Sequence, residues 1–338
     1  MSGAIVIVNW KTPDLVISCL RSLCQEIRVL AEWHVYVVDN DSQDGSAEKI
    51  ERARQREGWA DWVTVIQAAR NGGFSYGANI GITRGLRDNP GLHFLFLLNP
   101  DTEIRRGAIT VLRDFLQNRP SVGLAGARSE DPDGTAQECA FAFPSLLREF
   151  ASGLRLGVFD RLFSRQLRSH GTPDKPTEVD WVSGAALMIR REVFEQIGLL
   201  DEGYFLYFEE TDFAVRAKRA GWRCWHVPES RVVHLVGQSS GLSSRDSAPP
   251  RRPAYWFESR RRFFVLNYGL AYCLVVDTLF LIGYVTWRAR RLIQRKPYQD
   301  PPHFLRDFLA GSALCRGRTE LAPRKSFRVD LKCHRFDA

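Results

Sequence analysis

Residues 94–103, FLFLLNPDTE, constrain the fold of this chain more than any other segment. The first five are all apolar in a run too short to cross a membrane, which indicates a strand buried on both faces. The chain then turns polar at Asn99, Pro100 and Asp101. A buried parallel strand carries such a carboxylate to the carboxyl edge of its sheet, where open α/β sheets bind ligands. We therefore take Asp101 as a candidate metal ligand, with a simple turn as the alternative.

The length of 338 residues allows a large core, and we expect one main domain over residues 1–245 with a smaller helical region over residues 246–338. The composition, 44% hydrophobic and 25% charged, is typical of a globular protein. A net charge of +8 predicts an anionic partner. Arginines crowd the last third of the chain around an apolar run, which favours a membrane surface over nucleic acid.

The seven cysteines include no CxxC pair, which argues against a disulfide framework and against a zinc site. A reduced, cytoplasmic compartment fits them. Strand-like sequence begins at Ala4 without a charged leader, so we expect no secretory signal.

Short β-branched runs alternate with helical segments through the first part of the chain. Residues 4–8, 35–38 and 63–66 are predicted strands, and a helix cap with a following proline comes after the first of them, at Thr12. The second strand ends in Asp39, which is placed to accept hydrogen bonds from a ribose or a base. A helix cap is the alternative for the acidic cluster there. We predict that Asp39 binds a nucleotide.

A glycine-rich segment, ARNGGFSYGANIG at residues 69–81, follows the third strand. Its glycines let the backbone approach a ligand closely before a helix begins near Ser75. The segment contains neither the Gly-Lys-Ser/Thr of a P-loop nor GxGxxG. Between acidic strand ends it predicts the floor of a nucleotide site, with Arg70 and Asn71 as polar contacts.

Further strands are expected at residues 122–127 and from Val179 through Ile189, the second followed by a helix over residues 191–197. Residues 138–178 are interpreted as an irregular lid or acceptor loop. The alternation of strands with helices predicts an α/β fold with a mainly parallel, doubly wound, Rossmann-like sheet.

Three carboxylates, Glu209, Glu210 and Asp212, open a helix directly after an aromatic stretch. Acidic residues in a first turn also complement the helix dipole, which is the simpler explanation. Crowded carboxylates beside an apolar wall raise one another's pKa, as a general base requires. We predict that one of the three takes a proton from a substrate hydroxyl. His234, which follows a later strand, is either a packed residue or a ligand of the metal.

The chain resembles the inverting family-two glycosyltransferases, in particular their rhamnosyltransferase-like branch. The resemblance rests on seven segments in the right order, IVIVNW, VVDNDSQDGS, RNGGFSYGANIG, LLNPDTE, WVSGAALMIRR, LDEGYFLYFEETDFAVR and VVHLVGQSS, and covers about residues 4–240. It implies a GT-A fold, a nucleotide-sugar donor and a divalent cation, Mg²⁺ or Mn²⁺.

The resemblance also implies which residues hold the donor. The nucleoside would be bound by Asn9, Thr12, Asp39, Arg70, Asn71, Gly73, Phe74 and Asn79. In the WVSGAALMIRR segment, Trp181, Gly184 and Ala185 would lie at the donor and acceptor.

The metal and the base are implied in the same way. Asp101 stands at the last position of the family's DxD motif, where this chain has Asn99 at the first, and His234 would approach the metal or the diphosphate. The family's Glu-Asp pair falls on Glu209 and Glu210. That departure leaves the base open among these two residues and Asp212.

The implied chemistry is a single displacement without a covalent enzyme intermediate. Glu210 would deprotonate an acceptor hydroxyl, and a cation on Asp101 would offset charge on the departing nucleoside diphosphate. By likeness the donor is dTDP-rhamnose and the acceptor is a glycan or a lipid-linked glycan in polysaccharide biosynthesis. The alternative is a non-catalytic nucleotide-sugar or glycan-binding protein on the same fold. A dehydrogenase or nucleotidyltransferase would require glycine-rich signatures that the sequence lacks.

Residues 263–287 form an apolar stretch with Asp277 as its single charge and with arginines on both sides. A bilayer span needs ~20 residues, so the stretch is long enough. A charge near its middle would cost ~3 kcal/mol, and the two basic flanks define no orientation. We predict a pair of helices that lie peripherally on the inner face of the membrane, with a helix buried against the main domain as the alternative.

Overall fold

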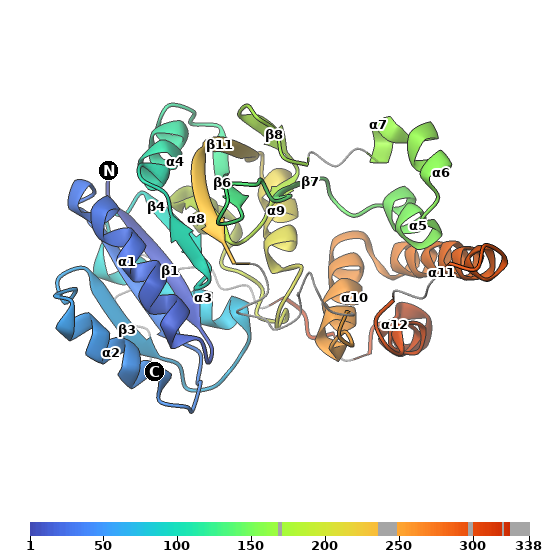
Figure 1. Cartoon of the computed structure of the whole chain (residues 1–338), viewed down its shortest axis with the longest axis horizontal. Helices are drawn as coiled ribbons and strands as arrows, with labels where there is room; N and C mark the ends of the chain where they lie inside the picture. The colour runs from blue at the N-terminus through green and yellow to red at the C-terminus, as the bar shows by residue number, and fades with distance from the viewer. Residues whose placement is uncertain (168–170, 236–248, 297–299, 320, 325–338) are drawn as a thin grey trace.

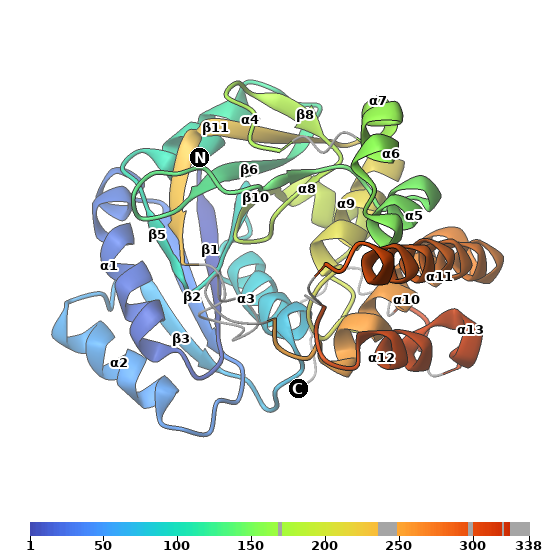
Figure 2. The ribbon, with the colours of Figure 1, turned by 45° about the vertical axis from the view of Figure 1, so that its right-hand side comes forward.

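The computed structural model describes residues 1–167, 171–235, 249–296, 300–319 and 321–324. Its central feature is a mixed, mostly parallel sheet covered by helices on both faces, with a group of C-terminal helices packed beside it (Figures 1 and 2). The predicted α/β class is therefore confirmed. The domain boundary expected after residue 245 and the end of the VVHLVGQSS segment lie outside the described residues.

The large sheet has the strand order β3-β2-β1-β4-β10-β6-β11-β5, and β8 pairs with β11. The strands are β1 (Gly3–Asn9), β2 (Trp33–Asp39), β3 (Val63–Gln67), β4 (Phe94–Leu98), β5 (Thr102–Ile104), β6 (Val122–Glu130), β7 (Ala140–Phe141), β8 (Thr177–Val179), β9 (Trp181–Val182), β10 (Ala186–Arg190) and β11 (Arg223–His234). β1 to β4 are parallel, as predicted, whereas β10 is antiparallel to both β4 and β6. β7 and β9 form a separate antiparallel pair.

Helices cover both faces of this sheet and form the C-terminal group. They are α1 (Pro13–Val29), α2 (Ser46–Arg56), α3 (Phe74–Asp88), α4 (Ala108–Gln117), α5 (Leu146–Leu154), α6 (Gly157–Leu162), α7 (Ser164–Leu167), α8 (Arg191–Ile197), α9 (Glu209–Arg219), α10 (Ala254–Tyr268), α11 (Leu270–Ile293), α12 (Phe304–Gly311) and α13 (Ala313–Arg316). α1, α2 and α4 pack on one face of the sheet, and α3, α8 and α9 pack on the other.

The apolar strands are buried on both faces because helices lie on each side of them. In β1, Ile5 and Ile7 face the α1 side while Val6 faces the α3 side. In β4, Phe96 packs with the first cluster and Leu97 with the second. Successive side chains of a strand point to opposite faces, so a central strand covered twice must be apolar throughout.

Two predicted segments differ from the structure. The single strand expected from Val179 through Ile189 is wrong: the chain turns at residues 183–185 between β9 and β10, and the Ala185 carbonyl oxygen accepts a 2.9 Å hydrogen bond from the Asn99 amide. The irregular loop expected over residues 138–178 is also wrong where the structure describes it. It contains β7, α5, α6 and α7, and Ser145 caps α5 by accepting a hydrogen bond from the Arg148 amide.

The apolar stretch near the C-terminus is divided into α10 and α11 at Gly269, which has φ +90°. α11 packs along α5, and two glycines allow the close approach. A Cβ on Gly153 would lie 2.5 Å from the Phe280 carbonyl oxygen, and a Cβ on Gly283 would lie 2.7 Å from the Phe150 carbonyl oxygen. Larger residues at either position would push the two helices apart.

Asp277 faces the interior of the helical group. Its carboxylate is fully buried, accepts a 2.5 Å hydrogen bond from Arg260 of α10, and accepts a second of 2.7 Å from the Ala313 amide. Arg260 also pairs with Glu149 of α5 at 2.7 Å. The one charge of the stretch is thus neutralised within the protein. Within the described ranges α11 is the one helix long and apolar enough to cross a membrane by length and composition, a test that buried core helices also pass.

Candidate active site

The carboxyl ends of β1, β2 and β4 bring polar residues to one edge of the sheet. In the parallel register Asn9 lies opposite Asp39, and Ile7 lies opposite Leu98, the residue before Asn99. Parallel strands that end together must place the residues that follow them side by side. We call this edge, marked by Asn9, Asp39 and Asn99, the strand-end rim.

Asp39 is buried in the strand-end rim and anchors its neighbours. The Asn9 amide donates a 2.6 Å hydrogen bond to Oδ1 of Asp39, and the Ser42 hydroxyl donates one of equal length to the same oxygen. The Ser42 backbone amide donates to Oδ2 at 3.1 Å. These bonds fix the turn after β2. Asp39 also lines a hollow of about 340 Å³ that extends to Arg52 and Gln67.

A pocket of about 430 Å³ opens at the strand-end rim. It is lined by Val8, Trp10, Thr12, Asn40, Asn71, Gly73, Phe74, Asn99, Pro100, Phe205, Leu206 and Tyr255. The predicted nucleotide contacts Thr12, Asn71, Gly73 and Phe74 are in this lining, whereas Asn9, Asp39, Arg70 and Asn79 are not. A cleft with aromatic walls and a few polar groups is typical of small-ligand sites.

Sequence reasoning missed several residues of this pocket, among them Trp10, Phe205 and Tyr255. Trp10 closely follows a buried strand, and that position in the sequence was a signal that could have found it. In the structure its side chain is 45% exposed. Tyr255 had no local signal, because only folding brings α10 to the strand-end rim.

Gly73 shapes the floor of the pocket. It has φ +84°, and a Cβ there would lie 2.1 Å from the carbonyl oxygen of Phe205. That same oxygen accepts a 2.8 Å hydrogen bond from the Phe74 amide. Only glycine allows this contact, so the glycine-rich segment is joined directly to the loop that carries Phe205. Asn40 supports the segment from β2, with its amide 3.0 Å from the Gly73 carbonyl oxygen.

Two other predicted contacts have different surroundings. The Asn79 amide donates to the Leu200 carbonyl oxygen at 2.9 Å and accepts from the Leu200 amide at 3.1 Å, so it ties α3 to the segment before α9. We do not carry Asn79 into the proposed nucleotide contacts. The Arg70 guanidinium is exposed and stacks on Tyr76, 4.4 Å from the ring centroid.

Asp101 and His234 come together beside the strand-end rim. Nε2 of His234 lies 3.5 Å from Oδ1 of Asp101, and the Leu235 amide donates to the Asp101 carbonyl oxygen at 2.9 Å. β11 pairs with β5 so that His234 lies opposite Thr102, which sets this distance. The described residues contain no cluster of three or more His, Cys, Asp or Glu side chains able to hold a metal.

One buried carboxylate and one imidazole nevertheless fit a Mg²⁺ or Mn²⁺ ion. Mg²⁺ in particular is held by one or two protein carboxylates, with substrate phosphates and water as its other ligands. The pair of Asp101 and His234 supplies such a partial set of ligands, so a cation at this place would depend on the bound ligand for the rest.

Glu209 and Glu210 begin α9 directly after two residues in the left-handed region, Tyr207 at φ +70° and Phe208 at φ +68°. Burial and the neighbouring charge of Glu210 hold the pKa of Glu209 well above its usual range. Burial also raises the pKa of Glu210, against hydrogen bonds from its own backbone and that of Gly184. Within the part of the chain that the structure describes, Oε2 of each carboxyl is buried without a hydrogen-bond partner. Buried carboxyl groups with raised pKa values are candidates for a functional role.

Asp212 has a different environment from the other two carboxylates. It accepts hydrogen bonds from Arg216 at 2.9 Å, from Asn267 of α10 at 2.8 Å and from the Tyr204 hydroxyl at 3.2 Å, and it pairs with Arg324. Burial raises the pKa of Asp212, but Arg216 and Arg324 outweigh it and hold the pKa below its usual range. The Asp212 carboxylate is fully engaged in holding α9 against α10, so we do not carry it forward as a base.

The turn between β9 and β10 connects the carboxylates of α9 to the strand-end rim. A Cβ on Gly184 would lie 3.7 Å from Oε1 of Glu210, while the next residue, Ala185, accepts the hydrogen bond from Asn99. Two consecutive residues of this turn thus contact Glu210 on one side and Asn99, two residues before Asp101, on the other. Trp181 packs at the start of this turn, with its ring centroid 4.4 Å from that of Phe141.

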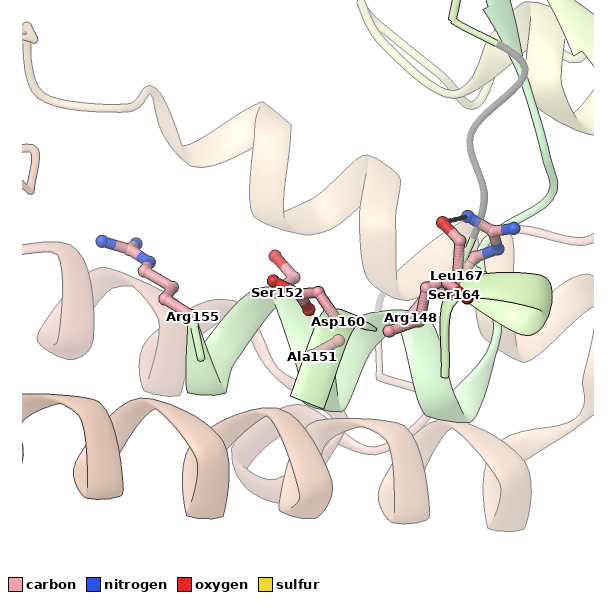
Figure 3. Close-up of a pocket in the computed structure, with 7 residues that line it drawn as sticks. All are labelled: Arg148, Ala151, Ser152, Arg155, Asp160, Ser164 and Leu167. Carbon is pink, nitrogen blue, oxygen red and sulfur yellow. Dashed lines mark hydrogen bonds between the residues drawn. The ribbon is translucent and has the colours of Figure 1, made fainter. Parts of the chain in front are cut away.

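A larger hollow, of about 750 Å³, lies away from these residues between α5, α6 and α7 (Figure 3). Arg148 on its wall donates a 3.0 Å hydrogen bond to the Leu167 carbonyl oxygen, and Arg155 pairs with Asp300 at 2.8 Å. The lining contains none of the predicted site residues, so size alone does not identify the active site.

Comparison with known proteins identifies the family of the chain. Residues 3–248 match the family model described as glycosyltransferase like family 2. An N-acetylglucosaminyl-diphospho-decaprenol L-rhamnosyltransferase of Mycobacterium tuberculosis is 29% identical over 215 residues, which cover 61% of this chain and 68% of that protein. The dTDP-rhamnosyl transferase RfbF of Shigella flexneri is 26% identical over 252 residues, 73% of this chain and 76% of that protein. Rhamnosyltransferase WbbL of Escherichia coli is 36% identical over 143 residues, 42% of this chain and 52% of that protein.

Solved structures share the fold. Mannosyltransferase PcManGT from Pyrobaculum calidifontis, in complex with GDP-Man and Mn²⁺, superposes with a TM-score of 0.53 at 15% identity and covers 94% of this chain and 82% of its own. TarS of S. aureus in complex with UDP-GlcNAc gives a TM-score of 0.52 at 14% identity, covering 92% and 82%. The GT-A fold expected from the sequence is confirmed. The chain is a member of glycosyltransferase-like family 2.

Proposed function

We propose that this protein is an inverting glycosyltransferase that moves a sugar from a nucleoside-diphosphate donor to a hydroxyl group of an acceptor. One observation carries the proposal: the carboxyl group of Glu210, with its raised pKa, lies against Gly184, and the next residue, Ala185, binds Asn99 in the lining of the aromatic-walled pocket. A base at the edge of a donor-sized pocket is what a single displacement requires.

Glu210 is the group that accepts the proton. It is more exposed than Glu209, and it faces the turn that borders the strand-end rim. Burial and the charge of Glu210 hold the pKa of Glu209 well above its usual range, which favours the neutral form of that neighbour. The acceptor oxygen, once deprotonated, attacks the anomeric carbon from the face opposite the leaving group, and the sugar changes configuration.

The donor occupies the pocket at the strand-end rim, with its nucleoside against Thr12, Asn71 and Phe74. Asp101 and His234 would hold Mg²⁺ or Mn²⁺, which supplies positive charge to offset the charge that develops on the departing diphosphate. Backbone groups of the glycine-rich segment orient the donor, whichever of the two cations is bound.

We take dTDP-rhamnose as the donor because two of the similar proteins carry rhamnosyltransferase names with matches over most of their length. The name of the mycobacterial relative specifies a lipid-linked acceptor, N-acetylglucosaminyl-diphospho-decaprenol. A hydroxyl of a lipid-linked glycan is therefore the proposed acceptor, in the synthesis of a cell-surface polysaccharide.

A lipid-linked acceptor calls for a membrane contact, and α11 offers one. Its outward face presents Val275, Ile282 and Val285, which are 48%, 52% and 56% exposed. The hydroxyls of the exposed residues Thr278 and Thr286 are bonded back to carbonyl oxygens of the same helix at 2.8 Å, so they place no unsatisfied donor on this face.

Positive charge borders this apolar face. Arg295 and Lys296 are exposed just beyond the end of α11. Basic residues next to an apolar helix face favour the anionic surface of the inner leaflet. We propose that the protein is cytoplasmic and binds the inner face of the membrane peripherally through α11, with the Asp277 side turned to the protein.

The proposed reaction is tested by incubating the full chain with a panel of nucleotide sugars and a lipid-linked glycan, with Mn²⁺ or with EDTA. We expect transfer from dTDP-rhamnose in Mn²⁺ only, and a product whose anomeric configuration is opposite to that of the donor. Transfer with retained configuration would contradict the mechanism. Donor binding without transfer or hydrolysis under any condition would favour the non-catalytic alternative.

A further inference from the structure

One face of α10 runs along the loop that precedes Glu209 and Glu210. We call residues 201–208 the rim loop. The Ser259 hydroxyl donates a 3.0 Å hydrogen bond to the Leu206 carbonyl oxygen, and Arg262 makes a bidentate pair with Asp201 at 2.8 and 3.0 Å. Tyr255 packs on Phe205 with ring centroids 5.1 Å apart. Positions 255, 259 and 262 lie on one side of a helix, so a continuous helical face supports the rim loop.

The other side of the rim loop forms part of the donor pocket. Phe205 and Leu206 line that pocket, and the Phe205 carbonyl oxygen binds the Phe74 amide of the glycine-rich segment. The rim loop then leads through two strained residues, Tyr207 and Phe208, to the start of α9. Backbone in the left-handed region is unfavourable at bulky residues and persists only where the surroundings enforce it. Contacts with α10 are among the surroundings that do so.

Tyr255 does more than support the loop, because its side chain reaches the pocket lining itself. It is half-buried, with Phe205 on one side and Tyr207 6.4 Å away on the other. This residue lies beyond the segment that the family model matches, which ends at residue 248. The aromatic wall of the pocket is thus completed by a helix of the C-terminal region.

We propose that the Tyr255 ring contacts the bound nucleotide-sugar donor, so that the C-terminal helical region forms part of the donor site. The inference rests on the proposed function, because it needs a nucleotide in the pocket at the strand-end rim. An aromatic ring at such a wall contributes by stacking on the base or by packing on the apolar face of the sugar. The same helix that borders the membrane-facing α11 would then influence donor affinity.

The test compares dissociation constants of dTDP, UDP and GDP in Mn²⁺ by calorimetry for the full chain and its variants. For the nucleotide that the unmodified chain binds best, we expect Tyr255→Ala to weaken binding about tenfold, in keeping with the loss of one stacking contact. Tyr255→Phe keeps the ring and should stay within about twofold. Tyr255→Leu keeps apolar volume against Phe205 without an aromatic face, so it covers the case in which the alanine variant does not fold.

The matched control is Tyr268→Ala, a tyrosine of the same helix whose ring packs on Phe263, Phe264 and Tyr272 and which is not in the pocket lining. It should bind the nucleotide as the unmodified chain does. Equal affinity in Tyr255→Ala or Tyr255→Leu and the unmodified chain would overturn this inference alone. If the unmodified chain bound none of the three nucleotides, the donor site itself would be refuted, and the proposed function with it.

Discussion

Nε2 of His234 lies 3.5 Å from Oδ1 of Asp101, although the two residues come from the last strand of the sheet and from the turn after β4. Their proximity depends on β11 running antiparallel beside β5. A carboxylate and an imidazole this close together would offer two ligands to a divalent cation. A bound diphosphate and water would have to supply the other ligands. In the mechanism proposed above, a cation at this pair would therefore bind together with the donor rather than to the protein alone.

We expect Asp101→Ala to abolish the Mn²⁺-dependent part of nucleoside diphosphate binding, a loss of about tenfold or more in affinity. His234→Ala should have a smaller effect in the same direction. Calorimetric titrations with and without Mn²⁺ measure both. The neighbouring carboxylate Glu103 is exposed and accepts a hydrogen bond from Ser18, so Glu103→Ala is the control. It should bind nucleoside diphosphate with the same Mn²⁺ dependence as the unmodified chain. Unchanged Mn²⁺ dependence in Asp101→Ala would remove this residue from the metal site.

The stability of the protein should depend on pH through Glu209. Burial and the charge of Glu210 raise the pKa of Glu209 in the folded state above its value in the unfolded chain. The neutral form is therefore favoured by folding. That stabilisation is complete at pH values below the unfolded pKa and is lost as the pH rises through the folded one.

Glu209→Gln, which is neutral at every pH, should consequently unfold at a higher temperature than the unmodified chain at pH 8, and the difference should shrink towards pH 4.5. Thermal unfolding monitored by circular dichroism across this range is the appropriate measurement. Glu202→Gln, at a partly exposed carboxylate of the rim loop, serves as the comparison. If the difference in unfolding temperature instead grew towards acid pH, folding would not raise the pKa of Glu209, and the prediction would be wrong.

Membrane binding should depend on the outward face of α11. Ile282→Asp and Val285→Asp each place a charge on that face without touching the packed side, so we expect about a tenfold drop in the fraction bound to vesicles containing anionic lipid. Co-sedimentation measures the bound fraction, and raised salt should weaken it. Val29 is 74% exposed on α1, a helix at the opposite end of the molecule from α11 (Figure 1), and provides the control Val29→Asp. Equal sedimentation of all three variants would leave α11 without a membrane role.

Asp277 should be important for stability. Asp277→Ala leaves the buried guanidinium of Arg260 with Glu149 as its one carboxylate partner among the described residues, and breaking a buried pair in this way costs ~3–5 kcal/mol. Urea unfolding gives the difference. Asp307→Ala removes the exposed pair with Arg251 and should cost less than ~1 kcal/mol. Losses of similar size in the two variants would mean that burial of the Arg260 pair contributes little.

Much of the fold could be predicted from local patterns. Apolar runs such as residues 94–98 required two covered faces, and parallel strand ends required Asn9, Asp39 and Asn99 to share an edge, as they do. The antiparallel direction of β10 could not be predicted, because it depends on the turn at residues 183–185 rather than on periodicity. The break at Gly269 was hidden within a continuous apolar stretch.

The candidate site divides in the same way. The three carboxylates near the start of α9 were visible as a cluster, but the sequence could not distinguish them. The structure does, because Asp212 meets Arg324 and Asn267 from distant segments while the carboxyl of Glu210 lies beside Gly184. Tyr255 could not be predicted. It lines the pocket from a helix far along the chain, and no sequence pattern near the other pocket residues points to it.

The central claim, that Glu210 is the base of the transfer reaction, is tested most directly by the rate of sugar transfer at saturating donor and acceptor for Glu210→Gln. The account predicts a drop of about 10²–10⁴-fold with donor affinity unchanged, since a glutamine keeps the shape and loses only the ability to accept a proton. Glu209→Gln should retain far more activity. A Glu210→Gln variant that transfers sugar at the unmodified rate would contradict the account.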